Sequence, residues 1–285
     1  METRVAGASG EVIIGHDLPT VLIGERINPT GKKKLAASLR EGDLSVVREE
    51  ARGQVAAGAD ILDVNVMITG VDEVAMLPRA VEAVAGTVDV PLCLDSHNVR
   101  ALEAALQVCP GRPIINSVTG EAASLETILP LVKEHGVPVI GLTLDDTGIP
   151  ADPAARVAIA HLIVERAAAL GIPREDIIID CLTLALGANT NAGLGTLEAV
   201  RLVKRELGVN QTQGASNISH GLPNRLWLNG VYLALAIEAG LTCPTVDAAQ
   251  VRFAALAADL VLGRDDYAMR FISAFRQAEG ASAGA

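Results

Sequence analysis

The chain has 285 residues, of which half are hydrophobic and only 2% aromatic, and its formal net charge is -11. Such an aliphatic composition allows a large core to be buried within one domain. The acidic balance argues against nucleic-acid binding, which needs a basic surface, but a few local cations are still able to hold an anionic small ligand.

Cysteine spacing and the N-terminal residues indicate in which cellular compartment the protein is expected. The four cysteines form no CxxC pair and no Cys-His spacing typical of zinc, so we expect reduced, buried thiols and no bound metal. Residues 1–11 lack a basic start followed by an apolar run, which predicts no signal peptide. Since no apolar stretch reaches the roughly 20 residues of a membrane span, we expect a cytoplasmic protein that does not contact a membrane.

Short apolar runs alternate with longer helical patterns after a leader over residues 1–19. The runs predict eight strands, at 20–23, 61–64, 91–94, 113–115, 137–144, 177–179, 214–216 and 244–246, the seventh being the least apolar. The patterns between and after them predict helices at 44–57, 74–84, 99–108, 125–135, 153–170, 197–207, 226–239 and 248–262. A further helix is expected at 267–277 and a frayed end over 279–285.

The regular order of these elements predicts the α/β class. Glycines follow several helices directly, as at Gly58 and Gly136, where a left-handed residue commonly ends a helix. Eight strand–helix units favour a (β/α)₈ barrel over a doubly wound sheet, which usually has a GxGxxG turn after its first strand; here that turn reads GERINPTG. No linker divides the chain, so residues 1–285 are predicted to form a single domain.

Carboxylate and amide side chains follow nearly every predicted strand. They include Glu25, Asn28, Asp63, Asn65, Asp95, Asn98, Asn116, Asp145, Asp180, Asn217 and Asp247. Active sites of barrels lie at this end of the strands, although any single Asp or Asn there also fits a helix cap or a turn. A pocket rich in carboxylates and amides selects a ligand that presents hydrogen-bond donors. A reduced pterin fits, but spacing alone does not single it out among heterocycles.

Seven ordered blocks between Val21 and Phe275 carry a resemblance. They read IGERIN, LDVNV, LCLDS, INS, GLT, ID and SNIS. In this order they resemble the methyltetrahydrofolate:corrinoid methyltransferases, which belong to the pterin-binding barrel superfamily together with dihydropteroate synthase. The chain is also similar to the folate module of cobalamin-dependent methionine synthase.

The resemblance implies roles for individual residues. Asp95, Asn116 and Asp180 match residues that hold the pterin ring, and Asn217 matches the amide that reaches N5, the methyl-bearing atom. Arg225 matches a folate-site arginine, and His220 stands where known relatives carry Gln. Residues expected to support this site are Glu25, Asn28, Asp63 and Asn65. The segment Met67-Ile68-Thr69 departs from the small residues usual there and indicates a reshaped rim.

The implied reaction moves the N5 methyl group between 5-methyltetrahydrofolate and the Co(I) of a corrinoid (cobalamin) on a separate protein. N5 must gain a proton or a strong hydrogen bond to leave; Asn217 is the expected catalytic residue, with water or His220 as the proton source. The resemblance also implies a homodimer. A DxHxxG corrinoid motif is absent, since the similar run from Asp95 ends in Arg100. The alternatives are a dihydropteroate synthase and a non-catalytic folate-binding subunit.

Overall fold

The computed structural model describes the backbone of residues 1–283 and the side chains of residues 1–279. Eight parallel strands are hydrogen-bonded in the order β10-β3-β4-β5-β6-β7-β8-β9, and a parallel bridge between Gly214 and Thr245 closes the ring. The strands are β3 (Ile23–Ile27), β4 (Ile61–Val64), β5 (Leu92–Asp95), β6 (Ile114–Thr119), β7 (Val139–Leu142), β8 (Ile177–Asp180), β9 (Asn210–Thr212) and β10 (Thr245–Val246). The predicted single-domain (β/α)₈ barrel is confirmed.

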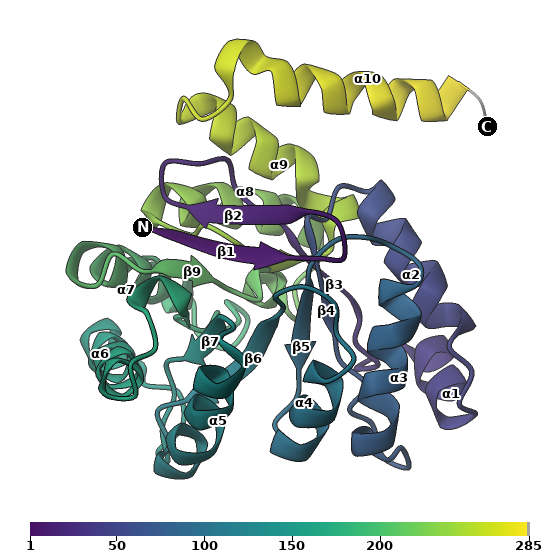
Figure 1. Cartoon of the computed structure of the whole chain (residues 1–285). Coiled ribbons are helices and arrows are strands. Elements are labelled where there is room, and N and C mark those ends of the chain that lie inside the picture. Colours follow the sequence, from purple (N-terminus) through teal and green to yellow (C-terminus); the bar gives the residue numbers. More distant parts are fainter. Residues whose placement is uncertain (284–285) are drawn as a thin grey trace.

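Helices surround the strands (Figure 1). They are α1 (Lys33–Arg40), α2 (Ser45–Ala56), α3 (Glu73–Ala85), α4 (Val99–Leu106), α5 (Ala122–His135), α6 (Pro153–Ala169), α7 (Ala192–Glu206), α8 (Arg225–Ala239), α9 (Ala248–Val261) and α10 (Met269–Ala283). Short 3₁₀ turns are η1 (Arg174–Asp176), η2 (Ala215–Ser219) and η3 (Asp266–Ala268). Local sequence sets the helix ends: the Asp152 carboxylate accepts from the Ala154 amide before α6, and Gly136 ends α5 in the left-handed conformation.

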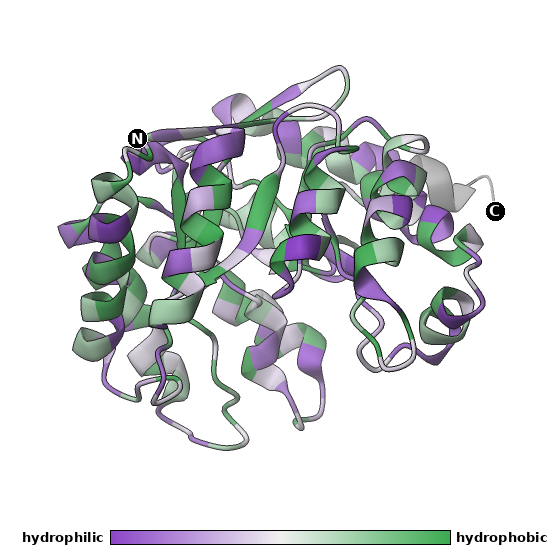
Figure 2. Cartoon of the chain, turned by 60° about the horizontal axis from the view of Figure 1, so that its bottom comes forward, coloured by the Kyte–Doolittle hydropathy of each residue, from purple (hydrophilic) through white to green (hydrophobic). Residues whose placement is uncertain are grey.

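Two apolar cores lie on either side of the strands. The larger lies between strands and helices, where the inward faces of the helices are apolar (Figure 2). The smaller fills the barrel interior near the strand starts and includes Ile23, Ile61, Cys93, Ile114 and Ile178. Because alternate residues of a strand share one face, the residues two positions further along β4, β5, β6 and β8 also face the axis.

The predicted leader is instead a β-hairpin. Strands β1 (Glu2–Ala6) and β2 (Glu11–Gly15) pair antiparallel across the end of the barrel at which its strands begin (Figure 1). Val5 and Ile14 are fully buried in the interior core. The Asn210 amide donates to Thr3 Oγ1 and the Ile14 carbonyl at 2.9 and 3.0 Å, which ties the hairpin to β9. Thr3 and Val5 of β1 are buried whereas Glu2 and Arg4 are exposed, which is the alternation of a strand with one buried face.

The predicted seventh strand at 214–216 is wrong. The strand is β9, which ends at Thr212, and residues 215–219 form the turn η2. The strand was missed because its residues Asn210-Gln211-Thr212 are polar yet buried, with their side chains hydrogen-bonded inside the fold. Helix α1, which begins at Lys33, was not among the predicted helices.

The remaining differences are at the ends of elements. The first barrel strand begins at Ile23, where the prediction ended. Helix α10 continues to Ala283, past the predicted fraying point at 279, and residues 284–285 lie outside the described residues. Within the described part of the chain, no helix combines the length and apolar character that a bilayer crossing requires.

Candidate active site at the carboxyl ends of the strands

Four polar residues form a layer directly above the interior apolar core. Each follows a core residue by two positions on the same strand: Asp63 follows Ile61, Asp95 follows Cys93, Asn116 follows Ile114 and Asp180 follows Ile178. Asp95 and Asn116 are neighbours in the register of β5 and β6. The barrel therefore changes from apolar to polar within one layer, at the end where barrel enzymes hold their sites.

Amides hold the carboxylates of this layer. Asn65 Nδ2 donates to Asp95 Oδ2 at 2.9 Å, and Asn116 Nδ2 donates to Asp63 Oδ1 at 3.2 Å. The Leu182 amide donates to Asp180 Oδ1 at 2.6 Å. The predicted supporting residues Asp63 and Asn65 therefore contact the predicted ring-binding residues Asn116 and Asp95.

The carboxyl groups lie close enough to perturb one another. Burial raises the pKa of Asp63 well above its ordinary value, and the charges of Asp95 and Glu25 add to the rise. Burial also raises the pKa of Asp95, against the Asn65 hydrogen bond, and that of Asp180 to about 7. Glu25 reaches a pKa of about 7 through burial and the charges of Asp95 and Asp247, opposed by Lys32. Such perturbed acids gathered in one place are typical of functional sites.

A cavity of about 360 Å³, within the range of small-molecule sites, opens at the same end of the barrel, and its lining does not include the four residues of the layer. Glu25 and Asn28 line it from β3 and the turn after it, and Asn217, His220 and Arg225 line it from η2 and the start of α8. Glu25 belongs to both places, since it lines the cavity and its charge acts on Asp63 and Asp180. The structure thus brings the predicted site residues to one end of the barrel.

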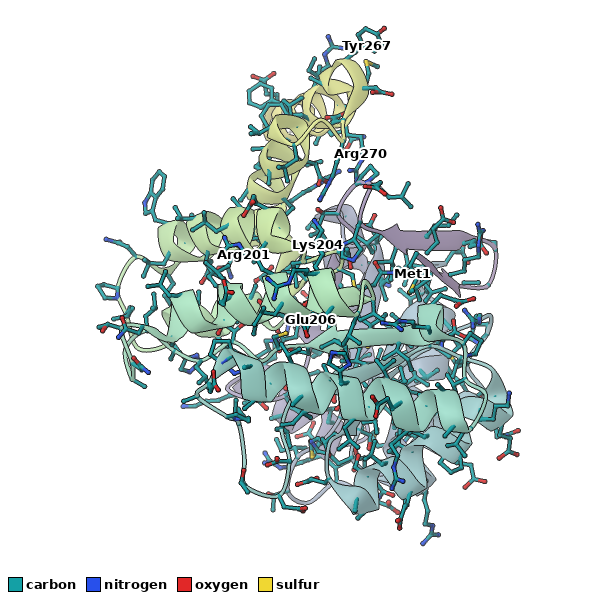
Figure 3. All side chains as sticks on the ribbon, turned by 90° about the vertical axis from the view of Figure 1, so that its left-hand side faces the viewer. Met1, Arg201, Lys204, Glu206, Tyr267 and Arg270 are labelled. Carbon is teal, nitrogen blue, oxygen red and sulfur yellow. The ribbon has the colours of Figure 1, made fainter. Side chains whose placement is uncertain are left out.

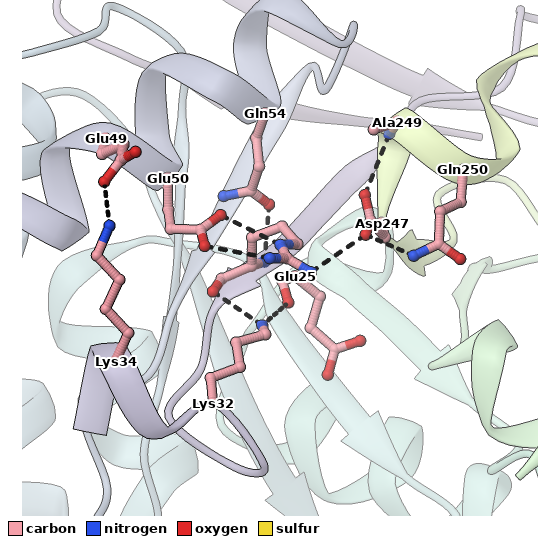
Figure 4. Close-up of polar contacts among 10 residues, drawn as sticks. Glu25, Lys32, Lys34, Glu49, Glu50, Gln54, Asp247, Ala249 and Gln250 are labelled. Carbon is pink, nitrogen blue, oxygen red and sulfur yellow. Dashed lines mark hydrogen bonds and ion pairs between the residues drawn. The ribbon is translucent and has the colours of Figure 1, made fainter. Parts of the chain in front are cut away.

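Two cations of the cavity were not predicted as site residues, and both have partners (Figure 4). Arg26 forms a two-pronged ion pair with Glu50 at 3.1 and 3.2 Å and a weaker one with Asp247 at 3.4 Å. Lys32 Nζ donates to the carbonyls of Glu25 and Arg26 at 3.1 and 2.9 Å. In Figure 4 the Glu25 carboxylate points away from these contacts. In the sequence, Arg26 is a charged residue shortly after a predicted apolar strand, and this position could have marked it as a site residue.

Several predicted polar residues have local structural roles. Asn28 Oδ1 accepts from the Thr30 amide at 3.0 Å, and Asp145 closes its own turn on Thr147. The side chains of Asn98 and Asp247 cap α4 and α9.

Arg225 donates to Ser219 Oγ and to the Ser216 carbonyl, both at 2.9 Å. It therefore braces the turn η2, which carries Asn217. The side chains of Asn217 and His220 are exposed at the cavity mouth. Among the residues that the structure describes, no group of three or more His, Cys, Asp or Glu side chains has the arrangement of a metal site.

Comparison with known proteins places this geometry in context. The chain is 29% identical over 267 residues to a methylcorrinoid:tetrahydrofolate methyltransferase of Eubacterium limosum, covering 90% of this chain and 96% of that protein. It is 33% identical over 263 residues to methionine synthase of Mycobacterium tuberculosis, of whose length it spans 22%.

Solved structures share the fold. Dihydropteroate synthase of Yersinia pestis gives a TM-score of 0.69 at 17% identity, over 91% of this chain and 99% of that one. The enzyme of Xanthomonas albilineans gives 0.65 at 20% identity, over 90% and 98%. The model of the family described as pterin binding enzyme matches residues 24–247, which contain the whole polar layer and the cavity-lining turn. This match covers most of the chain, and the protein therefore belongs to the pterin binding enzyme family.

Proposed function

We propose that the protein transfers the N5 methyl group between 5-methyltetrahydrofolate and the Co(I) of a corrinoid held by a separate protein. The observation that carries the proposal is the layer of Asp95, Asn116 and Asp180 at the same end of the barrel as a cavity whose mouth presents Asn217. The nearly end-to-end similarity to a methylcorrinoid:tetrahydrofolate methyltransferase supports it.

Pterin recognition follows from the chemistry of the layer. The amino-pyrimidine edge of a pterin presents parallel N–H donors, which a carboxylate accepts as it accepts those of a guanidinium. Asp180 is buried, and among the residues that the structure describes its carboxylate accepts from one amide, that of Leu182, so it has oxygen lone pairs for this edge. Asp95 and Asn116 supply a further acceptor and a mixed donor–acceptor pair. An enclosed, low-dielectric layer strengthens each of these bonds and makes an unmatched ligand costly.

The difficult step is the departure of N5. A tertiary amine leaves poorly unless it gains a proton or a strong hydrogen bond as the carbon–nitrogen bond breaks. Asn217 is the proposed catalytic residue, because its amide both donates and accepts and so follows N5 through a change of protonation. His220 and Glu25 line the same cavity, and burial raises the pKa of Glu25 to about 7, so that Glu25 is able to exchange a proton near neutral pH. Because the proposed contact of Asn217 with N5 strengthens only in the transition state, it raises the turnover rate.

A spectroscopic assay tests this proposal. The purified protein is mixed with 5-methyltetrahydrofolate and either free cob(I)alamin or a reduced corrinoid protein, and the loss of the Co(I) absorbance is followed. We expect enzyme-dependent conversion to methyl-Co(III). A non-catalytic folate-binding subunit binds the folate without this conversion, and a dihydropteroate synthase instead condenses a pterin pyrophosphate with p-aminobenzoate; either result overturns the proposal.

We further propose that two copies of the chain pair through α8, α9 and α10. All six aromatic residues of the chain lie between Trp227 and Phe275. Trp227 is 77% exposed and Tyr267, at the far tip of the molecule in Figure 3, is 94% exposed. Aromatic side chains are enriched in protein interfaces and often dominate their energy.

The same face carries an apolar groove between α8 and α9. Its lining includes Val231, Ala254 and Val261. Phe253 on α9 packs edge to face against Phe275 on α10. The exposed aromatic rings of Trp227, Phe253, Tyr267 and Phe275 present about 500 Å² of accessible surface. A standard interface buries about 800 Å² on each partner. Exposed Val, Leu, Ile and Met side chains supply the remaining area.

Charge favours a second copy as the partner. The sequences of α8 and α9 each contain only one acidic and one basic residue, whereas the chain carries a net charge of -11. Helix α10 adds Arg270, Arg276 and Glu279, so the three helices together have little net charge. Two equally acidic molecules repel least where they meet through such a face. We expect light scattering to give twice the 29.5 kDa chain mass for the wild type and for Leu162→Arg on α6. Val231→Arg should be a monomer, and a dimeric Val231→Arg would contradict this face.

A further inference from the structure

Arg156 lies near the start of α6. This side chain is only 1% exposed, and it forms no ion pair among the residues that the structure describes. Burying a guanidinium without a carboxylate partner is unfavourable, so its hydrogen bonds must offset the loss of hydration. Those bonds identify the segment that Arg156 holds.

The guanidinium joins three segments at the carboxyl ends of the strands. Nη1 donates to the carbonyls of Cys181 and Leu182 at 3.0 and 3.1 Å and to Thr196 Oγ1 on α7 at 3.2 Å. Nε donates to the Pro150 carbonyl at 2.7 Å. Two of these acceptors are the residues that follow Asp180. Arg156 therefore holds the turn by which the chain leaves β8.

That turn sets the direction of the Asp180 carboxylate. Leu182 has a φ of 57°, in the left-handed region that a residue with a branched side chain rarely adopts. In this conformation its amide donates to Asp180 Oδ1 at 2.6 Å. Thr143 donates to the Asp180 carbonyl through both its amide and its hydroxyl, which fixes the backbone on the other side. Without Arg156, the carbonyls of Cys181 and Leu182 would lose their shared donor and the turn would relax.

We propose that Arg156 is a positioning residue for Asp180: it holds the turn after β8 in the strained form in which the Leu182 amide aims the carboxylate at the axial layer. The inference rests on the proposed function, in which Asp180 accepts from the pterin edge. Arg156 is not among the residues that line the cavity of Glu25 and Asn217. The hydrogen bonds of its Nε and Nη1 go to backbone carbonyls and to Thr196.

Arg156 also affects the ionisation of Asp180. Burial raises the pKa of Asp180 to about 7, Glu25 adds to the rise, and the Leu182 amide and the Arg156 charge oppose it. The other titratable groups acting with Asp180 are Cys181, Tyr232 and Cys243, whose pKa values burial raises, so that they stay neutral at neutral pH. Loss of Arg156 therefore leaves Asp180 protonated to a higher pH.

The test measures Asp180 directly in the ligand-free protein. Carbon-13-labelled aspartate is followed by NMR from pH 5 to 9, and Asp180→Asn identifies the signal. We expect Arg156→Met, which keeps an unbranched stem without donors or charge, to raise the Asp180 pKa by about one unit. Arg174→Met is the matched control, since Arg174 also donates to a backbone carbonyl, that of Leu207 at 2.7 Å, but lies before β8.

Binding of 5-methyltetrahydrofolate supplies the second measurement. Calorimetry across the same pH range should show that Arg156→Met loses about tenfold in affinity at pH 7 and recovers part of it at pH 8.5, whereas Arg174→Met follows the wild type. If Arg156→Met does not fold, as judged by circular dichroism, Arg156→Lys carries the test with a smaller shift in the same direction. A folded variant with an unchanged Asp180 titration overturns the inference. A wild type that does not bind the folate overturns the proposed function alone, because the NMR titration needs no ligand.

Discussion

The two ends of the barrel interior differ in chemistry although the same strands build both. At the strand starts, Ile61, Cys93, Ile114 and Ile178 pack against the hairpin residues Val5 and Ile14. Two residues later the strands present Asp63, Asp95, Asn116 and Asp180. The difference shows how the barrel divides its tasks. One end is sealed and apolar, and it contributes stability; the other buries mutually repelling acids, which is unfavourable until a ligand pairs with them.

The largest expected effect is at the polar end. Asn217→Ala should slow methyl transfer to Co(I) by about 100-fold or more, the usual loss when one donor to a developing charge is removed. Its affinity for 5-methyltetrahydrofolate should change by only a few fold, because the proposed contact strengthens mainly in the transition state. Stopped-flow absorbance gives the rate and calorimetry the affinity.

The control is Asn191→Ala, at an exposed residue directly before α7. This variant should keep the wild-type rate of methyl transfer and the wild-type affinity for the folate. Equal losses of rate and affinity in Asn217→Ala would remove Asn217 from its catalytic role.

The apolar end should respond in stability and not in activity. Ile14 is fully buried in the interior core, so Ile14→Ala should lower the free energy of unfolding by about 3 kcal/mol, the usual loss for a large aliphatic side chain replaced by Ala. Methyl transfer at a temperature where the variant is folded should stay near the wild-type rate. Ile13→Ala, on the other face of the same strand, should lower the free energy of unfolding by less. Urea unfolding compares the three proteins, and a large loss of activity in folded Ile14→Ala would contradict the division between the two ends.

The smallest expected effect is the stability cost of the buried acids. Burial raises the pKa of Glu25 from its ordinary 4.5 to about 7, so between these values the folded chain binds more protons than the unfolded chain. The stabilisation from protonated Glu25 is therefore complete below about pH 4.5 and is lost as pH rises through 7. Relative to wild type, Glu25→Gln should gain stability at pH 8, by no more than the roughly 3 kcal/mol to which this pKa shift corresponds, and should gain nothing at pH 4.5.

Urea unfolding at the two pH values measures this difference. Glu41→Gln, an exposed site at the end of α1, serves as the control and should show no such pH dependence. A Glu25→Gln variant that is less stable than wild type at pH 8 would mean that the ionised side chain is well solvated.

Much of the site was predictable because it follows directly from strand periodicity. An apolar residue followed two positions later by Asp or Asn, as at Ile178 and Asp180, places one side chain in the core and the next in the axial layer. This local pattern repeats on four strands. The position after a predicted strand singled out Asp63, Asp95, Asn116 and Asp180 together with other Asp and Asn residues, and the family resemblance implied their individual roles. The alternation of apolar runs with helical patterns likewise determined the barrel.

Other features depended on contacts between distant segments. The hairpin β1–β2 and the polar strand β9 are held by hydrogen bonds such as that of Asn210 to Thr3, 207 residues apart, which no local pattern reveals. Nor does the sequence show that Arg26 pairs with Glu50, or that Arg156 lies beneath the turn after Asp180. The sequence alone determined which residues face the barrel axis, because strand periodicity is local. Only the tertiary structure decided which polar groups are paired and which remain open to a ligand, because pairing depends on where separate strands and helices meet.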